Sequence, residues 1–383
     1  MIDTTQRQSE FHLVIAGGGV AALEATLALR ELAGDRVRVT LIAPRDEFVY
    51  RPMTVQEPFA FPRAARYSLA EIASDVGAEL IQDAFGWVDP ANRVAHTRQG
   101  LAIPYDALLL ALGGRPLDRY PHALTVDDNR IDELLHGLVQ DVEGGYVKSI
   151  AFVMPPRMAW PLPIYELALM MARRAYDANV EIAITVATPE DTPLAIFGTG
   201  ASEAITTLLR DAGVQTIPNA YVEIPQAGHL VIGPGHRTLD VDRIVALPEL
   251  IGPSIRGLPG GENGFIPVTP ESAVRGVDRV YAAGDATDFP IKHGGIAAQQ
   301  ADAAARAIAA LAGADVEVKP FHPIIRGILL TGERPRYLTA QLVGGTGFSS
   351  QITDEATWSP PMKITAEYLS PYLDAREAQA VAR

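Results

Sequence analysis

The chain has 383 residues, of which 48% are hydrophobic and 20% are charged, so it can bury more than one core and is not a disordered acidic chain. Its formal net charge of −14, without any basic run, argues against nucleic-acid binding, because an acidic surface repels phosphate. The absence of cysteine excludes disulfides, cysteine nucleophiles, thiolate metal sites and dithiol redox relays.

The first predicted unit is a βαβ segment. The apolar run at 11–16 predicts a strand, which ends in Gly17-Gly18-Gly19. Leucines at helical spacing predict a helix over 21–32, and the β-branched run at 37–43 predicts a second strand. A strand, a glycine turn, a helix and a strand within about 30 residues form a unit with parallel strands.

A second alternating unit follows a buried-type strand at 105–112, which ends in Gly113-Gly114. This unit has the same alternation of strands and helices as the first. Strands are expected at 149–154, 181–187 and 214–217, and helices at 164–178 and 202–212.

The remaining elements complete the first unit and add a third region. The strand at 277–283 and the Ala-rich helix at 294–311 resemble the end of the first unit, so the second unit is inserted within it. The segments 324–330 and 336–343 predict an antiparallel pair. The fold class is therefore α/β, with two Rossmann-like domains, the second inserted in the first, and a C-terminal α+β capping region. The predicted boundaries are 1–120 with 245–319, then 121–244, then 320–383.

The glycine turn after the first strand fits the dinucleotide-binding pattern G-x-G-x-x-G/A through Gly17, Gly19 and Ala22. Gly17 permits the tight turn, Gly19 lets the backbone approach a pyrophosphate, and Ala22 lets the helix lie close to the strand. The helix N-terminus at Val20 and Ala21 offers N–H groups to the phosphates. A purely structural glycine turn is the alternative.

The second strand departs from this pattern. An acidic residue normally ends it and holds the ribose hydroxyls, but here the position is Ala43, followed by Pro44. We expect Ala43 and Pro44 to border the nucleotide. Asp46 or Glu47 could reach back to a ribose, although a solvated loop is the simpler interpretation for both.

Three further segments resemble motifs of the FAD-dependent pyridine nucleotide-disulfide oxidoreductases. Residues 105–116 (YDALLLALGGRP) resemble their second motif, and 280–285 (VYAAGD) resemble the third, whose aspartate accepts a hydrogen bond from the flavin ribityl chain. Residues 290–295 (PIKHGG) resemble the helix start that points at the flavin ring and stabilises negative charge on it. The resemblance covers nearly the whole chain and implies FAD contacts at Ala111, Leu112, Gly113, Gly284, Asp285, Gly294, Gly295 and Ile296.

Within that superfamily the chain most resembles sulfide:quinone oxidoreductases, flavocytochrome c sulfide dehydrogenases and type II NADH dehydrogenases. Residues 48–52 (FVYRP) resemble their loop beside the isoalloxazine ring, which implies flavin contacts from Arg51 and Pro52. Their C-terminal closing segment, which covers one face of the flavin, is resembled by Trp358, Pro360, Lys363 and Tyr368-Leu369.

Two departures from these relatives bear on the chemistry. Aligning Tyr165-Glu166 with the end of their C-x-G-A-P-Y-E stretch puts Trp160 in place of a catalytic cysteine, which excludes a persulfide at that position. Trp160 either packs over the flavin or a substrate, or is an ordinary core residue. The inserted unit begins with Pro155-Pro156 instead of a glycine fingerprint, and prolines cannot donate N–H groups to a pyrophosphate. Conventional NAD(P)H binding in this unit is therefore doubtful. Residues 198–201 (GTGA) could contact a phosphate, although a plain helix-capping loop is the stronger interpretation.

The candidates for catalysis are Trp160, His293 and Lys292. His293 could act as an acid or base beside the flavin, although a histidine at a helix start is more often a cap or a solvated residue. Lys292 could stabilise the anionic reduced flavin or lie on the surface. The eight histidines show no metal-binding spacing, so we predict no metal site.

Residues 1–10 are polar and carry both signs of charge, unlike a signal peptide, and no apolar window of 18 residues is present. The segment 363–383 carries too many charges for a membrane helix. These features predict a cytoplasmic protein for which membrane association is not expected.

The sequence as a whole predicts an FAD-dependent oxidoreductase whose flavin passes electrons directly to a small-molecule or quinone-type acceptor. Its expected partners are a small-molecule electron donor and a small-molecule electron acceptor, and nucleic acid is not expected. The sequence leaves open whether the protein forms a homodimer. The alternatives are an NAD(P)H:acceptor reductase and a flavin-binding redox sensor or scaffold without turnover.

Overall fold

Five parallel strands form the central sheet of the first domain, in the order β20-β9-β1-β2-β5. The computed structural model describes residues 10–157, 160–343 and 347–381. The strands are β1 (Phe11–Ala16), β2 (Val37–Ile42), β5 (Glu79–Ile81), β9 (Ala107–Leu110) and β20 (Val280–Ala282). Because β20 pairs with β9, the chain returns to the first sheet after the second unit, which confirms the predicted insertion.

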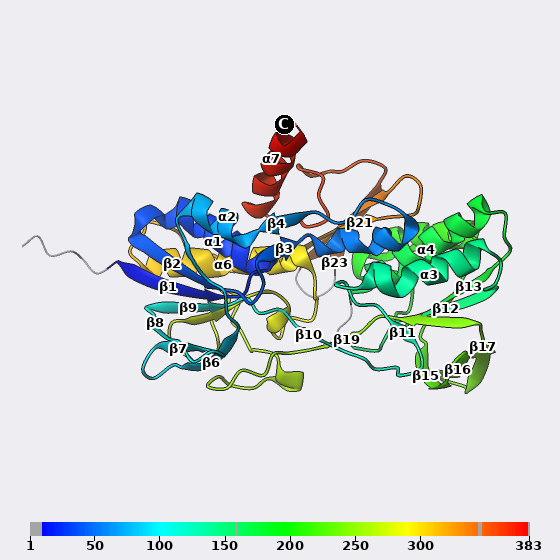
Figure 1. Cartoon of the computed structure of the whole chain (residues 1–383), viewed down its shortest axis with the longest axis horizontal. Helices are drawn as coiled ribbons and strands as arrows, with labels where there is room; N and C mark the ends of the chain where they lie inside the picture. Colours follow the sequence, from blue (N-terminus) through cyan, green and yellow to red (C-terminus); the bar gives the residue numbers. More distant parts are fainter. Residues whose placement is uncertain (1–9, 158–159, 344–346, 382–383) are drawn as a thin grey trace, which may run out of the picture.

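Both faces of this sheet are covered (Figure 1). Side chains alternate along β1, so Leu13 and Ile15 pack with α1 (Val20–Ala33) and α6 (Gly294–Leu311), while Val14 packs against an antiparallel meander on the other face. The meander was not predicted and consists of β6 (Phe85–Asp89), β7 (Val94–Thr97) and β8 (Ala102–Pro104).

One excursion leaves the first domain between β2 and β5. It contains the hairpin strands β3 (Glu47–Val49) and β4 (Arg66–Ser68), with the 3-10 segment η2 (Arg51–Phe59) between them, and then helix α2 (Leu69–Val76). The segment η2 contacts α3 (Ile131–Glu143) and α4 (Leu162–Asp177), so this excursion reaches the second domain.

The second domain repeats the plan of the first, with parallel strands in the order β11-β18-β12-β13-β14. These strands are β11 (Leu124–Thr125), β12 (Ser149–Val153), β13 (Ala183–Ala187), β14 (Val214–Ile217) and β18 (Arg243–Ala246). Its helices are α3 (Ile131–Glu143), α4 (Leu162–Asp177) and α5 (Thr199–Asp211). A second unpredicted meander covers the other face with β15 (Tyr221–Gln226), β16 (His229–Gly233) and β17 (Arg237–Asp240).

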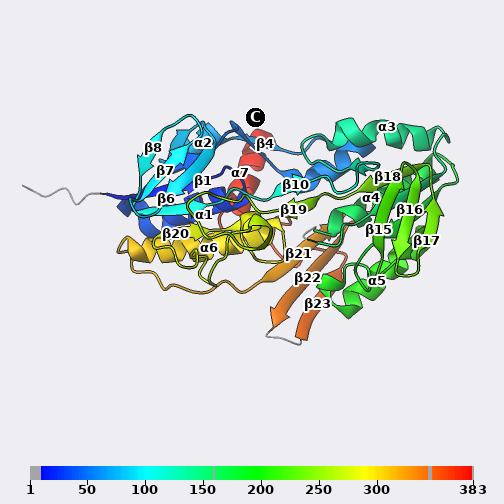
Figure 2. The ribbon, with the colours of Figure 1, turned by 90° about the horizontal axis from the view of Figure 1, so that it is seen from below.

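A two-stranded antiparallel ribbon of β10 (Arg115–Leu117) and β19 (Glu249–Ile251) connects the domains (Figure 2). The chain leaves the first domain along one strand and returns along the other. The predicted domain boundaries remain predictions. The boundary expected between residues 244 and 245 falls inside strand β18.

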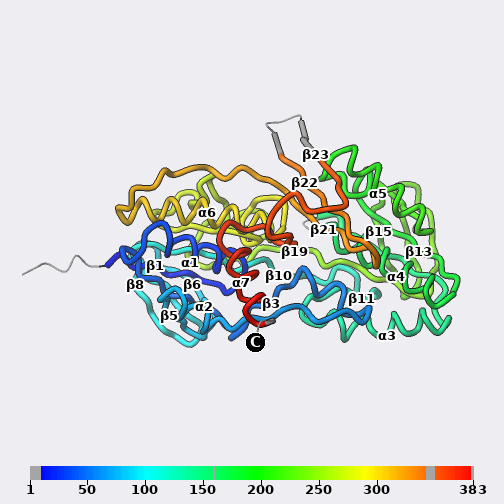
Figure 3. Tube along the Cα trace, turned by 90° about the horizontal axis from the view of Figure 1, so that it is seen from above, coloured from blue at the N-terminus to red at the C-terminus, as the bar shows by residue number. Residues whose placement is uncertain are grey.

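The C-terminal region is mixed α+β, as predicted. Strands β21 (Ile324–Leu329) and β22 (Arg336–Val343) are antiparallel, and an unpredicted third strand, β23 (Gly347–Thr353), pairs with β22. Helix α7 (Leu369–Val381) then returns to contact α1 (Figure 3). Among the described residues, no helix combines the length and the apolar character needed to cross a bilayer.

Candidate functional site

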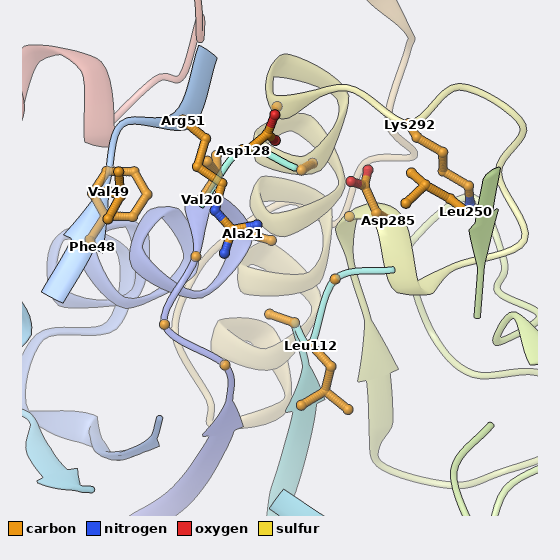
Figure 4. A pocket seen from close by; sticks show the side chains of 18 of the residues that line it. Val20, Ala21, Phe48, Val49, Arg51, Leu112, Asp128, Leu250, Asp285 and Lys292 are labelled. Atoms are coloured by element: carbon orange, nitrogen blue, oxygen red, sulfur yellow. The ribbon is translucent and has the colours of Figure 1, made fainter. Parts of the chain in front are cut away.

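A cavity of about 730 Å³ opens where the two domains and the C-terminal region meet. Its walls follow the carboxyl ends of β1, β2, β9 and β20 in the first sheet and of β11 and β18 in the second. Doubly wound sheets bind ligands at these ends, and the volume suits a small molecule or cofactor. Figure 4 shows part of the cavity and the side chains that line it.

The glycine turn between β1 and α1 forms one wall. Gly17 has φ +133°, and a Cβ there would lie 2.2 Å from the Ala111 carbonyl oxygen, so the turn requires glycine. A Cβ on Gly19 would meet nothing within 4 Å. No side chain caps α1, so its first N–H groups have no side-chain partner at the cavity wall, an arrangement that suits an anion. The Arg51 side chain reaches toward the start of α1 and adds a positive charge (Figure 4).

Asp285 lies in the turn η5 (Gly284–Ala286), directly after β20. The Gly284 N–H donates to the side-chain oxygen of Gln300 at 2.8 Å, which fixes the turn. The Asp285 carboxylate points into the cavity (Figure 4). Burial raises the pKa of Asp285, and the positive charge of Lys292 opposes this rise.

Most of the predicted cofactor-binding residues line this one cavity. They are Gly17, Gly19, Val20, Ala21, Ala43, Pro44, Arg51, Pro52, Ala111, Leu112, Gly113, Gly284, Asp285 and Gly294. The other three, Ala22, Gly295 and Ile296, are buried in α1 and α6 and do not line it. Of the two acidic residues after β2, Glu47 lines the cavity and Asp46 does not.

Two of the three predicted catalytic residues, Trp160 and His293, pack together at the cavity wall. Their ring centroids lie 4.5 Å apart, and Trp160 also packs edge-on against Phe197 at 5.9 Å. The His293 Nδ1 atom is buried without a hydrogen-bond partner among the described residues. Burial, together with the Lys363 charge, lowers the pKa of His293 to about 4, so its imidazole is neutral at pH 7.

The third predicted catalytic residue, Lys292, is 4% exposed and is therefore not the surface lysine that the sequence left open. Its Nζ donates to the Thr287 carbonyl at 2.5 Å and lies 3.9 Å from the centroid of the Phe265 ring. Burial lowers the pKa of Lys292 to about 8, and the Asp285 charge opposes this change. Lys292 is thus a buried cation behind Asp285, with its ammonium held by a backbone carbonyl.

A buried ion pair that sequence analysis did not find joins three elements at the cavity wall. The Lys363 Nζ lies 2.6 and 2.8 Å from the two carboxylate oxygens of Glu166 and donates to the Pro52 carbonyl at 3.0 Å. Glu166 also accepts from the Leu330 N–H at 2.9 Å. Burial raises the pKa of Glu166, and the ammonium opposes that rise. The pair ties the C-terminal segment to α4 and η2.

Asp128, in the loop between β11 and α3, also lies outside the predicted set. Its side chain is accessible and lines the cavity, and Figure 4 shows it near Arg51. Protein surrounds it closely enough that burial raises the pKa of its carboxyl, against the opposing charge of Arg51. The second domain thus presents a carboxyl group to a guanidinium of the first.

The second sheet has an acidic residue, Glu190, after the end of β13, where a ribose-binding acid would lie in a nucleotide domain. Its carboxylate accepts from the Tyr165 hydroxyl at 2.5 Å and from the Thr188 hydroxyl at 3.1 Å. Tyr165 is fully buried. The carboxylate of Glu190 therefore serves an internal hydrogen-bond network. The segment 198–201 begins α5 and does not line the cavity.

Glu24 of α1 anchors the start of α7. Its carboxylate accepts from the backbone N–H groups of Glu367, Tyr368 and Leu369 at 2.7, 3.0 and 2.6 Å. Burial and the Glu24 charge raise the pKa of Asp302, beside it on α6, to about 9. The raised pKa favours the protonated form of Asp302, which lessens the repulsion beside the anchor.

The fold and the cavity together define a class of protein: two Rossmann-like domains, one inserted in the other, around a ligand cavity at the carboxyl ends of their sheets. This is the fold of the FAD-dependent pyridine nucleotide-disulfide oxidoreductases, as the sequence resemblance implied. No family model matches the chain.

Particular solved structures share this fold. The sulfide:quinone oxidoreductase of the hyperthermophilic bacterium Aquifex aeolicus superposes with a TM-score of 0.78 at 18% identity, over 90% of this chain and 87% of that one. A ferredoxin reductase from Rhodopseudomonas palustris superposes with a TM-score of 0.67 at 19% identity, over 89% of this chain and 88% of that one. At identities this low, the superpositions show a common fold alone.

A curated protein also matches in sequence. The sulfide-quinone reductase of Aquifex aeolicus (strain VF5) is 31% identical over 111 residues, which are 27% of this chain and 24% of that protein. The match thus spans about a quarter of the length of the curated relative. A match of this extent does not transfer the activity of the whole relative.

Proposed function

We propose that the chain is an FAD-dependent oxidoreductase that passes electrons from the flavin directly to a small-molecule or quinone-type acceptor. The observation that carries this proposal is a single cavity lined by the glycine turn, by Asp285 and by Lys363-Ile364 of the C-terminal segment. Backbone N–H groups at a helix start suit a pyrophosphate, and a carboxylate suits the hydroxyl groups of a ribityl chain. FAD carries both groups.

The residues of the cavity fit this cofactor. Gly19 would let the pyrophosphate approach the backbone, and Arg51 would give it a second positive partner. Asp285 would accept a hydrogen bond from a ribityl hydroxyl. Helix α6 begins at Gly294 without a side-chain cap, so its positive end would favour an electron-rich ring. When bound, FAD supplies the two-electron chemistry, and the protein orients it.

The acceptor would meet a largely apolar wall. Val126, Leu162, Leu247 and Ile328 line the cavity on the side of the second domain and the C-terminal sheet. Such a wall suits a quinone-type ring better than a polar substrate. Since the chain contains no cysteine, electrons reach the acceptor without a persulfide or disulfide step.

The proposal does not include a conventional NAD(P)H-binding site in the second domain. Pro155 and Pro156 stand where a glycine fingerprint would offer N–H donors, and the Glu190 carboxylate already accepts from two hydroxyl groups. These two observations favour a donor other than a nicotinamide.

Absorbance spectroscopy of the purified protein, followed by anaerobic titration, tests the proposal. We expect a flavin spectrum that stays oxidised when NADH or NADPH is added. Prompt bleaching by either nucleotide would support an NAD(P)H:acceptor reductase. A chain that takes up no FAD on reconstitution would refute the proposed function, and one that binds FAD but turns over no donor and acceptor would be a redox sensor or scaffold.

Replacing Asp285 with alanine is expected to weaken FAD binding about 10- to 100-fold, the effect of losing a hydrogen bond to a charged group. Fluorescence titration of the apoprotein with FAD measures the change. Asp288→Ala is the matched control, because this aspartate is exposed three residues away and does not line the cavity. Equal FAD affinity in the two variants would contradict the role proposed for Asp285.

A further inference from the structure

Most charged side chains that line the cavity already have a partner or a proposed role. Arginine stays protonated. The Lys363–Glu166 pair is joined by two short hydrogen bonds, and the ammonium of Lys292 is held by a carbonyl. His293 is neutral because its pKa is lowered to about 4, and Asp285 is the proposed ribityl acceptor.

Two carboxyl groups remain, Glu47 and Asp128. Glu47 follows β2, and its carboxylate lies 3.5 Å from the Arg66 guanidinium across the β3–β4 hairpin. Asp128 comes from the second domain, beside the apolar wall. The charged groups that face it are Arg51 from η2, Lys363 from the C-terminal segment, Asp285 from η5 and Asp127 from its own loop.

We propose, resting on the proposed function, that Asp128 donates a proton to the acceptor as it is reduced in this cavity. The acceptor gains two electrons and two protons. FAD, when bound and reduced, would supply the two electrons and one proton, and the O–H bond of the Asp128 carboxyl breaks to give the other proton. The resulting carboxylate faces the positive charges of Arg51 and Lys363, and water that enters the cavity returns the proton.

The surroundings of Asp128 suit a general acid. An aspartate in water has a pKa of about 3.9 and is ionised at pH 7. Burial raises the pKa of Asp128, which brings it closer to the pH at which a proton donor is effective. The Arg51 charge opposes this rise and stabilises the carboxylate that remains after donation. Because the acid form is needed, the rate of acceptor reduction is expected to fall as the pH rises through this pKa.

Reoxidation of the reduced holoprotein tests the proposal, with menadione as the acceptor. The flavin is photoreduced without oxygen and mixed with menadione in a stopped-flow spectrometer, at pH values from about 5 to about 9. Asp128→Asn is expected to slow reoxidation about 100-fold at the acid end and to remove the pH dependence, because the amide cannot give up a proton. Asp128→Glu is expected to restore a pH-dependent rate.

Asp127→Asn is the matched control. Asp127 is the neighbouring residue, but its carboxylate accepts from the backbone and side chain of Asn129 at 3.0 and 2.8 Å, and it does not line the cavity. We expect this variant to keep the rate of the wild type at the acid end and a pH-dependent profile, which moves to lower pH because the lost Asp127 charge no longer raises the pKa of Asp128. The infrared difference spectrum of the oxidised proteins between the two pH limits gives a readout without turnover: the carboxyl band of Asp128 is expected to disappear in Asp128→Asn alone.

Several results would overturn the inference. One is an Asp128→Asn variant with the rate and pH profile of the wild type; another is a uniform slowing that leaves the pH profile and the infrared band unchanged. A wild type that reduces menadione no faster than free reduced FAD would overturn it as well. The FAD affinity of the apoproteins distinguishes a failure of this inference from a failure of the proposed function. All variants are expected to bind FAD within about 3-fold of the wild type. A wild type without FAD affinity would overturn the proposed function itself.

Discussion

Replacing Lys363 with methionine is expected to lower the free energy of unfolding by about 3–5 kcal/mol. Methionine retains much of the apolar stem of lysine but leaves the Glu166 carboxylate, which is 1% exposed, without its counterion. The Leu330 N–H alone does not offset the burial of a charge, so Glu166 must take up a proton or admit water. Urea unfolding of the apoprotein, followed by circular dichroism, measures the loss.

The double variant Lys363→Met/Glu166→Leu isolates the cause of this effect. Removing both partners of a buried ion pair is often close to neutral, so the second substitution is expected to recover at least half of the lost stability. A loss of less than about 1 kcal/mol in the single variant, the range of an exposed ion pair, would contradict the structural role of the pair.

Replacing Gly19 with alanine is expected to leave the protein folded and to weaken FAD binding about 100-fold. The backbone at Gly19 has φ −97°, which alanine adopts readily, and its Cβ would meet no protein atom within 4 Å. The new methyl group would instead stand where the proposed function has the pyrophosphate approach the backbone, and displacing that contact removes charge-assisted hydrogen bonds. FAD titration of the apoprotein measures the affinity, and thermal unfolding reports the fold.

Alanine substitutions at two further glycines serve as controls for this result. Gly200→Ala, in the first turn of α5 and away from the cavity, also has open space around the new Cβ and is expected to bind FAD normally. Gly17→Ala is expected to impair folding, because its Cβ would lie 2.2 Å from a backbone oxygen. If Gly19→Ala kept full FAD affinity, the pyrophosphate would not lie at this turn.

The parallel βαβ parts of the fold could be predicted because their signals are local. The strand before Gly17 is continuous and apolar, and the glycine turn lies within a few residues of it. Helix α6 has the bounds Gly294–Leu311 that the Ala-rich run predicts. The antiparallel strands of the two meanders and β23 were missed because they are short or only partly buried, so their apolar pattern is weak.

The charged groups of the cavity could not be predicted in the same way. Lys363 and Glu166 are 197 residues apart, and no local pattern marks either as half of a buried pair. Asp128 lies in a polar loop, which in sequence is indistinguishable from a solvated turn. His293 and Lys292 were found by resemblance, but the burial that lowers both pKa values depends on the packing of distant elements.

The anchor between Glu24 and the start of α7 has a consequence for the synthesis of the protein. Glu24 is fully buried, yet its three hydrogen-bond donors lie at 367–369, more than 340 residues further along the chain. On the ribosome, β1 and α1 emerge first, whereas β20, α6 and Lys363-Ile364, which complete the cavity, emerge last. A nascent chain therefore offers a dinucleotide only a partial wall, so under the proposed function FAD would bind after translation.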